Sequence, residues 1–454
     1  MAGGAPLIRM SLTEIASVVG GHAVQGDVLV SAPASVDSRN VAAGSLFVAI
    51  AGANVDGHDF VQSAFENGAT AALVSKTIDG PHVLVADVVQ ALGLLAAHVS
   101  KKLQATELKV IGITGSQGKT TTKDLLFAIL TGAGPTVAPS NSFNNEIGVP
   151  LTILRADEQT RFLIVEMGAR GIGHITHLAQ IAQPSIGAVL NVGHAHAGEF
   201  QSIKQTAIAK GELLLAIPKA GFAVVNGDDP LVSRMPTAAQ RIVFGAGQEI
   251  CASNVQLNEY AEPRFELSVG NESKEISLSI SGEHNVMNAL AAAAIAHACG
   301  LSIEVIAQGL NSFSTLSAMR MERSTRADGL VIVNDAYNAN PESMKAAINA
   351  LSAMSCQGRR ILVVGTMGEL GEQSAQLHFE IGKYAVSRSI DVLVAIGEFA
   401  GEYAQGFGPE TRTFVELPAA VTFVEQLVKP NDVILIKASR SAGLERVAQG
   451  LLSK

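Results

Sequence analysis

One segment of the sequence has the residue types and spacing of a phosphate-binding loop. An apolar run at 110–113 leads into Thr114-Gly115-Ser116-Gln117-Gly118-Lys119-Thr120-Thr121, and a helical pattern follows. In such a loop the glycines let backbone N–H groups face an anion at a helix N-terminus, the lysine reaches the outer phosphates and a hydroxyl ligates magnesium. The strict motif has glycine where Ile113 stands, so this is a shortened variant. An ordinary strand-to-helix turn is the alternative, and the Gly-Lys-Thr order makes it the weaker one.

Polar residues also follow several of the predicted strands. Glu166 closes the strand 162–166, Asn191 leads from the next strand to His194 and His196, and Asp335 closes a strand of the C-terminal third. Ligands of open α/β sheets collect at the carboxyl ends of the strands. A single strand-end carboxylate or loop histidine is more often a solvated residue. Together with the phosphate loop, these positions favour a nucleotide and magnesium site.

Parallel strands and helices are needed to position these residues, and the hydrophobic pattern of the chain predicts such elements. Short β-branched runs alternate with longer Ala/Leu-rich helical runs, which predicts an α/β fold with parallel sheets. Three blocks emerge: a small α/β unit at 1–84, a central phosphate-loop domain at 85–316 and a doubly wound, Rossmann-like domain at 317–454. A polar, β-rich insert at 243–281 reads as an extension of the central sheet.

Composition excludes several classes of protein. The chain has 454 residues and a formal net charge of −9, so no basic face is expected and nucleic acid is an unfavoured partner. No apolar run reaches the roughly 18 residues that a membrane helix needs. The three cysteines have no metal-binding or redox spacing, and the N-terminus has no signal-peptide pattern. We expect a cytoplasmic protein without a membrane span.

Other candidate residues stay ambiguous from spacing alone. Lys210 lies in a helical pattern and reads as an exposed helix lysine. His174 and His177 follow a glycine-rich turn and are more typical of a polar helix start than of a metal site, so we leave them out of the site. The glycines after the strand 361–364 lack the dinucleotide spacing, so bound NAD is poorly supported.

Several motifs in this order resemble the Mur ligase family. The resemblance rests on residues 112–123, 144–150, 166–169, 209–212, 284–288 and 335–341, with 37–39 and 437–441 near the two ends. It covers nearly the whole chain, and it is closest to the members that add D-alanyl-D-alanine to UDP-N-acetylmuramoyl-tripeptide. It implies the three-domain Mur ligase architecture, a monomer and an ATP-dependent carbon–nitrogen ligase of peptidoglycan synthesis that acts through an acyl phosphate.

The resemblance also implies roles for individual residues. Lys119 and Thr120 would hold the ATP phosphates and Mg²⁺, with Glu166, His196 and Lys210 as further metal ligands. Lys210 matches a lysine that family members often carry as a carbamate, an oxygen-donor anion suited to a hard cation. The remaining positions fall into two groups. The nucleotide is expected to contact Asn285, Asn288, Arg320, Asp335, Tyr337 and Asn338, and the UDP-linked substrate to contact Ser38, Arg39, Asn145 and Glu146.

Four rival functions remain open. A sister ligase that adds the third amino acid is disfavoured by the run 337–341, and a folylpolyglutamate synthase by the module at 37–39. A regulatory protein would bind ATP without turnover, and this reading is disfavoured by Lys119, Glu166, His196 and Lys210. A kinase or NTPase would turn over without an amine acceptor.

Overall fold

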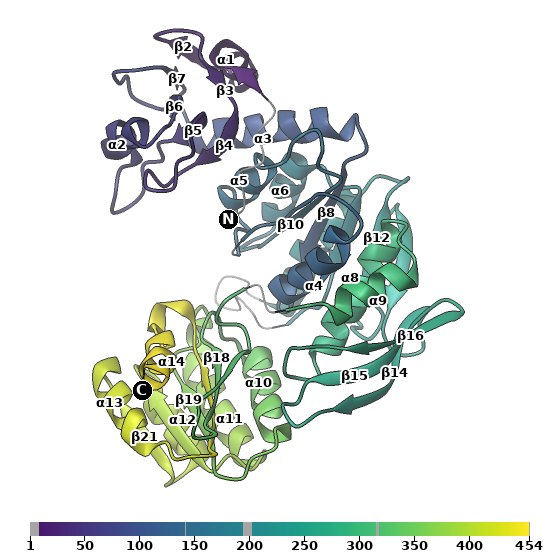
Figure 1. The fold of residues 1–454 in the computed structure, drawn as a ribbon, viewed down its shortest axis with the longest axis vertical. Helices are drawn as coiled ribbons and strands as arrows, with labels where there is room; N and C mark the ends of the chain where they lie inside the picture. The colour runs from purple at the N-terminus through teal and green to yellow at the C-terminus, as the bar shows by residue number, and fades with distance from the viewer. Residues whose placement is uncertain (1–8, 141, 194–201, 315–316, 454) are drawn as a thin grey trace.

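The computed structural model of the protein describes residues 9–140, 142–193, 202–314 and 317–453. Three α/β parts follow one another along the chain, and the central part lies between the other two (Figure 1). The predicted α/β fold is confirmed, whereas the boundaries at 84/85 and 316/317 remain predictions. Within the ranges just given, no helix is long and apolar enough to cross a membrane.

The N-terminal part is built on a small sheet. Its elements are β1 (Met10–Ser11), α1 (Leu12–Val19), β2 (His22–Val24), β3 (Leu29–Val30), β4 (Ala32–Ser35), β5 (Ser45–Val48), η1 (Gly57–Phe60), α2 (Val61–Glu66), β6 (Ala71–Val74) and β7 (His82–Leu84). Five strands pair in the order β2-β7-β6-β5-β4, all parallel except β2, while β1 and β3 form a separate pair. The turn after β4 carries residues 37–39, which the resemblance assigns to the UDP group.

The central part has one large sheet. Its strands are β8 (Lys109–Thr114), β9 (Thr136–Val137), β10 (Phe162–Glu166), β11 (Ile186–Val189), β12 (Phe222–Asn226), β13 (Gln240–Phe244), β14 (Ile250–Leu257), β15 (Pro263–Val269) and β16 (Glu272–Ser277). They pair in the order β9-β10-β8-β11-β12-β13-β14-β15-β16. The strands from β9 to β13 are parallel, and β14 to β16 form an antiparallel extension. This extension is the predicted β-rich insert.

Helices cover both faces of the central sheet, because alternate residues of its buried strands point to opposite sides. The helices are α3 (Val88–Gln104), α4 (Lys119–Thr131), α5 (Gly148–Ile153), α6 (His174–Ala182), α7 (Ile203–Ala216), α8 (Asn285–Ala298) and α9 (Ile303–Asn311). Ile111 and Ile113 of β8 pack with α4, α8 and α9, whereas Val110 packs with α3, α5, α6 and α7. Helix α3 also contacts α1, so it joins the N-terminal part to the central one.

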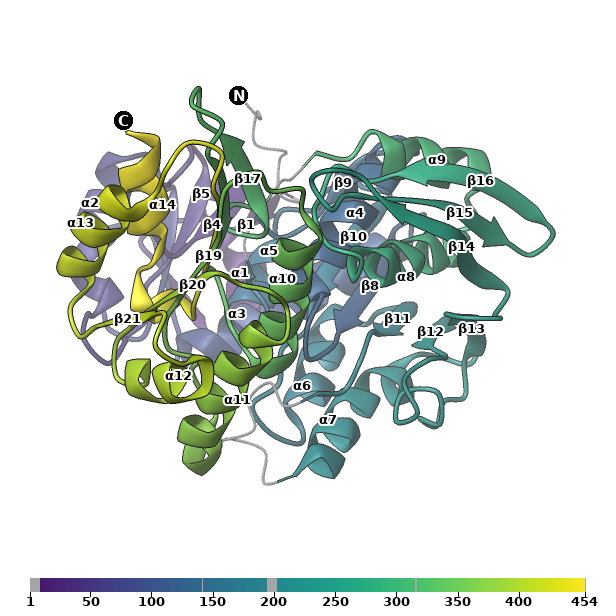
Figure 2. The ribbon, with the colours of Figure 1, turned by 90° about the horizontal axis from the view of Figure 1, so that it is seen from below.

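The C-terminal part is doubly wound, as predicted. Its elements are β17 (Glu322–Thr325), β18 (Val331–Asp335), α10 (Pro341–Ala353), β19 (Arg360–Val364), η2 (Gly371–Gln373), α11 (Ser374–Val386), β20 (Val392–Ile396), α12 (Ala400–Phe407), β21 (Thr411–Phe414), α13 (Leu417–Leu427), β22 (Val433–Lys437), η3 (Arg440–Ala442) and α14 (Glu445–Leu452). The strand order is β17-β18-β22-β19-β20-β21, parallel except for β17. Helices α10 to α12 pack on one face of this sheet and α13 and α14 on the other, as Figure 2 shows from below.

Candidate active site

The phosphate-loop sequence forms the turn between β8 and α4. Gly118 has a φ of +80°, and a Cβ at this position would collide with the side-chain oxygen of Asn288, so the turn requires glycine. Lys119 begins α4, and its Nζ donates a hydrogen bond to the carbonyl of Gly115 at 2.6 Å. The lysine side chain therefore folds back over the loop, where a bound phosphate would lie.

The end of strand β11 braces this loop from the side. The N–H of Gln117 donates to Asn191 Oδ1 at 3.0 Å, and the N–H of Gly193 donates to Ser116 Oγ at 2.8 Å. Asn191 Nδ2 in turn donates to the carbonyl of Gln117 at 3.2 Å. Asn191 is thus a positioning residue for the loop, and its place at a strand end was the sequence signal for it.

Glu166 presents a buried carboxylate beside the loop. Its Oε2 accepts a hydrogen bond from Thr120 Oγ1 at 3.3 Å, and its Oε1 has no hydrogen-bond partner among the residues that the structure describes. Burial raises the pKa of Glu166, against the opposing positive charges of Arg320, Lys123 and Lys119. A buried carboxylate with an open oxygen next to a threonine hydroxyl fits a hard cation such as Mg²⁺.

The described residues supply only part of a magnesium site. No group of three His, Cys, Asp or Glu side chains that could hold a metal gathers among them. Magnesium commonly binds one or two carboxylates and completes its octahedron with phosphate oxygens and water, so Glu166 and Thr120 are compatible with it. The predicted ligand His196 lies outside the described residues.

Lys210 is buried, which corrects the interpretation of an exposed helix lysine. Its exposed fraction is 2%, whereas Ile208 and Leu215 of the same helix are 56% and 62% exposed. Helix α7 therefore exposes some apolar side chains while it buries a charged one, which a hydrophobic pattern does not predict. Burial, and then the charge of Lys119, hold the pKa of Lys210 well below its usual range. A lysine in such a site deprotonates readily, and carbamate formation with CO₂ requires the neutral amine.

A cavity of about 600 Å³ opens between the central and C-terminal parts. Most residues predicted for ATP and magnesium line it, although they come from five separate segments of the chain. They are Ser116, Gln117, Gly118, Lys119, Thr120, Thr121, Glu166, Asn285, Asn288, Arg320, Asp335, Tyr337 and Asn338. Gly115 and Lys210 are not among the lining residues. We call this space the nucleotide cavity.

The C-terminal part reaches the phosphate loop through Arg320. Its Nη2 donates to Ser142 Oγ at 2.9 Å, and Ser142 Oγ lies 3.0 Å from Thr120 Oγ1. The guanidinium group stacks over the ring of Tyr337, with Cζ 4.4 Å from the centroid. Arg320 is therefore held beside the position of the outer phosphates. Ser142, which links it to the loop, was missed because only the fold brings it there.

A second polar cluster lines the same cavity. Lys437 Nζ is paired with Asp335 at 2.6 Å and donates to the carbonyl of Asn338 at 2.9 Å. His284 lines the same region, and burial lowers its pKa to about 4, so the ring is neutral at pH 7. Neutral and paired groups of this kind suit the uncharged ribose and base rather than the phosphates. Lys437 and His284 stand in the family motifs, but local spacing predicts no partner for either.

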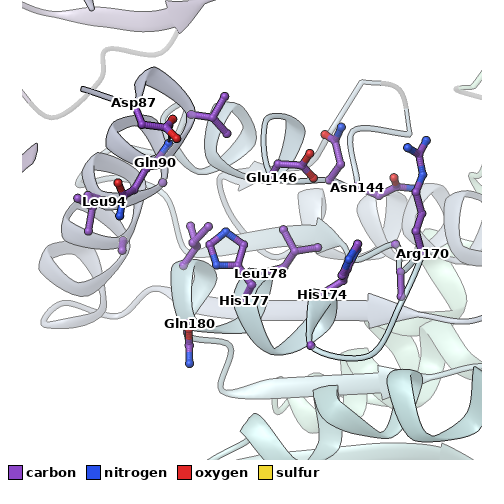
Figure 3. Close-up of a pocket in the computed structure, with 18 of the residues that line it drawn as sticks. Asp87, Gln90, Leu94, Asn144, Glu146, Arg170, His174, His177, Leu178 and Gln180 are labelled. Carbon is purple, nitrogen blue, oxygen red and sulfur yellow. Dashed lines mark hydrogen bonds between the residues drawn. The ribbon is translucent and has the colours of Figure 1, made fainter. Parts of the chain in front are cut away.

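A larger cavity, about 770 Å³, lies between α3 and α6 (Figure 3). Asn145 and Glu146, predicted for the peptide substrate, line it, and so do His174 and His177 of α6. Lys119, Asn144 and Arg170 line both cavities, so the two spaces meet at these side chains. We call this second space the peptide cavity. His174 and His177 were omitted from the predicted site because their spacing alone resembled a helix start.

Ser38 and Arg39 lie apart from both cavities, in the turn after β4. Asp37 accepts hydrogen bonds from Nε and Nη2 of Arg39, each at 2.9 Å, and this pairing lowers the pKa of Asp37 to about 2. The carbonyl of Ser38 accepts a hydrogen bond from Asn67 Nδ2 at 2.9 Å. The Arg39 side chain is 84% exposed, so it is available to an anionic group outside the cavities.

Comparison with known proteins agrees with this geometry. Family models match in three segments: "Mur ligase family, catalytic domain" at 34–100, "Mur ligase middle domain" at 113–296 and "Mur ligase, glutamate ligase domain" at 319–440. The UDP-N-acetylmuramoyl-tripeptide–D-alanyl-D-alanine ligase of Mycobacterium tuberculosis (strain H37Rv) is 40% identical over 98% of each chain. The chain belongs to the Mur ligase family.

Solved structures of Mur ligases share the whole fold. A MurF structure from Acinetobacter baumannii has a TM-score of 0.90 and 32% identity over 99% of this chain and 100% of that one. MurF from Thermotoga maritima, solved in complex with ADP, has a TM-score of 0.79 and 30% identity over 93% and 97% of the two chains. The predicted family and ligase class are confirmed, and the roles of individual residues remain predictions.

Glu166→Gln in this Mur ligase tests the proposed cation site through stability. Because the folded-state pKa of Glu166 is raised, its contribution to stability is greatest at low pH and is lost as pH rises through that pKa. Glutamine is uncharged at every pH, so the E166Q protein does not lose stability in this way as the pH rises. We therefore expect E166Q without ligand to have a melting temperature at least as high as that of the unsubstituted protein at pH 7 to 8, yet to gain less stability from Mg²⁺ with ATP.

Melting temperatures from pH 5 to 8, with and without Mg²⁺ and ATP, measure both effects. Glu158→Gln, which changes an exposed carboxylate of the same part, is the matched control and should keep the ligand-induced rise. An E166Q protein stabilised by Mg²⁺ and ATP as strongly as this control would remove Glu166 from the cation site.

Proposed function

We propose that this Mur ligase joins D-alanyl-D-alanine to UDP-N-acetylmuramoyl-tripeptide at the cost of ATP, giving UDP-N-acetylmuramoyl-pentapeptide, ADP and phosphate. One observation carries the proposal: the nucleotide and peptide cavities meet at Lys119, Asn144 and Arg170. A carboxylate at the end of a peptide in one cavity can therefore approach a phosphate in the other. The Mycobacterium tuberculosis relative reported above carries the name of this ligase and matches 98% of this chain.

The geometry supports a reaction in two steps. The terminal carboxylate of the tripeptide attacks the γ-phosphorus of ATP, and ADP leaves, which gives an acyl phosphate. The amine of the dipeptide then attacks the acyl carbon, loses a proton and displaces phosphate. Lys119 and Arg320 lie where negative charge accumulates on the transferring group, and fixed positive charges there stabilise it most in a water-poor site.

The magnesium ion would be held by Thr120 and Glu166, with His196 and Lys210 as further proposed ligands. When bound, it supplies a positive charge that neutralises phosphate oxygens. The chain's own contribution is to hold these groups in place: Thr120 is fixed by hydrogen-bond contacts with Glu166 and Ser142. Asn285 and Asn288, hydrogen-bonded to each other at 2.9 Å, are proposed to contact the base.

The further partner assignments follow from the same features. Action as a monomer is proposed from the resemblance to the Mur ligase family alone. The net charge of −9 gives no support for nucleic acid as a partner. A nucleotide-linked precursor and ATP are metabolites of the cytoplasm, so we place the enzyme there.

Product analysis with the purified protein tests the function. The protein is incubated with ATP, Mg²⁺ and UDP-N-acetylmuramoyl-tripeptide carrying either meso-diaminopimelate or L-lysine, with and without D-alanyl-D-alanine. We expect ADP release that requires the dipeptide and a product with the mass of the UDP-pentapeptide. ADP release without any acceptor would indicate an NTPase. In a parallel incubation with UDP-N-acetylmuramoyl-dipeptide and a free diamino acid, formation of the UDP-tripeptide would indicate the sister ligase.

Arg39→Ala tests the N-terminal contribution. Hydrogen bonds to charged groups contribute about 1.5–3 kcal/mol, so loss of this guanidinium group from a diphosphate should raise KM for the UDP-linked substrate roughly tenfold or more. KM for ATP should stay unchanged, because Arg39 lies outside the nucleotide cavity. Arg412→Ala, an exposed arginine of the C-terminal part, is the control. Equal KM values for the UDP substrate in both variants would refute the assignment.

A further inference from the structure

Helix α6 begins at the peptide cavity without a cap of its own. Its N-cap residue is Gly173, which has no side chain to accept a hydrogen bond from the first turn. The φ of Gly173 is +92°, whereas a capping serine, threonine or aspartate takes an extended backbone with negative φ. This backbone conformation disfavours a capping side chain at position 173. The first N–H groups of α6 therefore need acceptors from elsewhere.

Glu212 of helix α7 supplies these acceptors. The N–H of Gly173 donates to Glu212 Oε1 at 2.6 Å, and the N–H of Thr176 donates to Glu212 Oε2 at 2.8 Å. The Thr176 hydroxyl donates to the same Oε2 at 3.0 Å. The N–H groups of the N-cap residue and of the third helical residue are the two that a capping box satisfies from within its own helix. Here one carboxylate of another helix satisfies both.

This form of cap places a charged group inside the protein. Glu212 is only 8% exposed, and a buried charge is unfavourable unless it is paired or hydrogen-bonded. A cap from within α6 would need no buried carboxylate. The cap from α7 differs from such a local cap because it also fixes the start of α6 to another helix. That helix carries Lys210, two positions before Glu212.

The segment that Glu212 fixes forms one side of the peptide cavity. We call residues 168–177 the peptide wall, and six of them line the cavity: Gly168, Ala169, Arg170, Gly173, His174 and His177. His174 and His177 point into the cavity from the first turns of α6 (Figure 3). Strand β10 ends at Glu166, so the wall is held at one end by the central sheet and at the other by Glu212. A shift of the α6 start would therefore move side chains that face the peptide.

We propose that Glu212 is a positioning residue for the tripeptide: it holds the peptide wall in place relative to helix α7 and so sets the fit of the peptide in its cavity. This inference rests on the proposed function, in which the peptide cavity takes the tripeptide. Glu212 is not among the residues that line either cavity, so it acts through the wall and not by contact with a substrate. A cap that served stability alone would leave the affinity for the peptide unchanged.

Isothermal titration calorimetry of the full-length protein without ATP separates the two roles. Glu212→Gln keeps the shape of the side chain but offers one acceptor oxygen in place of two, so one N–H group of α6 meets the amide NH₂. We expect Kd for UDP-N-acetylmuramoyl-tripeptide to rise roughly 3- to 30-fold, the range that the loss of a helix cap can produce. Kd for UDP-N-acetylmuramic acid, which has no peptide, should be unchanged. KM for ATP and for D-alanyl-D-alanine should be unchanged as well.

Two further variants complete the test. Glu14→Gln is the matched control, because Glu14 Oε2 accepts the N–H of Ser11 at 3.0 Å in the capping box of α1 and does not line the peptide cavity. The E14Q protein should bind both UDP ligands like the unsubstituted protein. Thr176→Val removes only the hydroxyl bond to Glu212. It should give a smaller rise in Kd that is again confined to the UDP-tripeptide, and it carries the test if E212Q does not fold.

Two results would overturn the role of Glu212. One is an unchanged Kd for the UDP-tripeptide in folded E212Q, or in T176V where E212Q does not fold. The other is an equal loss of affinity for both UDP ligands, which would place the effect outside the peptide wall. If the unsubstituted protein itself does not bind the UDP-tripeptide, or binds it without ligating D-alanyl-D-alanine, the proposed function fails, which is a distinct result.

Discussion

Replacing Lys119 with methionine is expected to lower kcat for ligation by roughly 10³-fold or more, the range seen when a fixed charge is removed from phosphoryl transfer. Lys119 lines both cavities, so in the proposed reaction it lies between the attacking carboxylate and the γ-phosphate. Its Nζ already lies in the loop, 2.6 Å from the carbonyl of Gly115, so it needs little reorganisation to meet a phosphate. Methionine keeps the apolar stem and removes only the charge.

The measurement is single-turnover formation of ADP from ATP with the UDP-tripeptide present. Lys102→Met, an exposed lysine near the end of α3, is the control and should behave as the unsubstituted protein. Melting curves of both variants show whether the fold is kept. A K119M protein that is folded and forms ADP at the normal rate would contradict the placement of the phosphoryl transfer at the meeting of the cavities.

Lys210→Ala is expected to abolish ligation, with partial recovery when formate or acetate is added. A buried lysine near Lys119 is unfavourable as a cation, whereas a carbamate there adds oxygen ligands of the opposite charge. Alanine leaves a space in which a short carboxylate can supply the missing oxygens. The recovered activity should saturate with carboxylate concentration, because it depends on binding in that space.

Two controls sharpen this prediction. Lys219→Ala, an exposed lysine just after α7, should keep full activity and show no response to formate. In the unsubstituted protein, ¹³C-labelled bicarbonate should give a carbamate resonance that is absent from K210A. Full activity of K210A would remove Lys210 from the site. If K210A loses activity, is not rescued by formate, and the unsubstituted protein shows no carbamate resonance, Lys210 has a structural role only.

The sequence identified the residues whose role is local. The phosphate loop is contiguous, and Glu166 and Asp335 end strands of parallel sheets, whose carboxyl ends meet ligands in this fold class. Those residues do gather in one cavity. The predicted strands at 110–113, at 162–166 and before Asn191 also correspond to β8, β10 and β11.

The site features that the sequence does not predict depend on contacts between distant segments. Ser142 becomes part of the site because the fold sets it between Thr120 and Arg320. The burial of Lys210 is not apparent from the sequence, because Ile208 and Leu215 of the same helix face solvent although they are apolar. His174 and His177 line a cavity only because α3 packs alongside α6, more than 70 residues away in sequence. None of these facts has a signature in local spacing.

The most direct test of the account follows an oxygen atom. UDP-N-acetylmuramoyl-tripeptide labelled with ¹⁸O at both oxygens of the reacting carboxylate is incubated with the enzyme, ATP, Mg²⁺ and D-alanyl-D-alanine. The masses of the released phosphate and of the product are then measured by mass spectrometry. If that carboxylate attacks the γ-phosphate where the cavities meet, each phosphate released carries one labelled oxygen and the new amide keeps the other. Unlabelled phosphate, or phosphate released without the UDP-pentapeptide, would contradict the account.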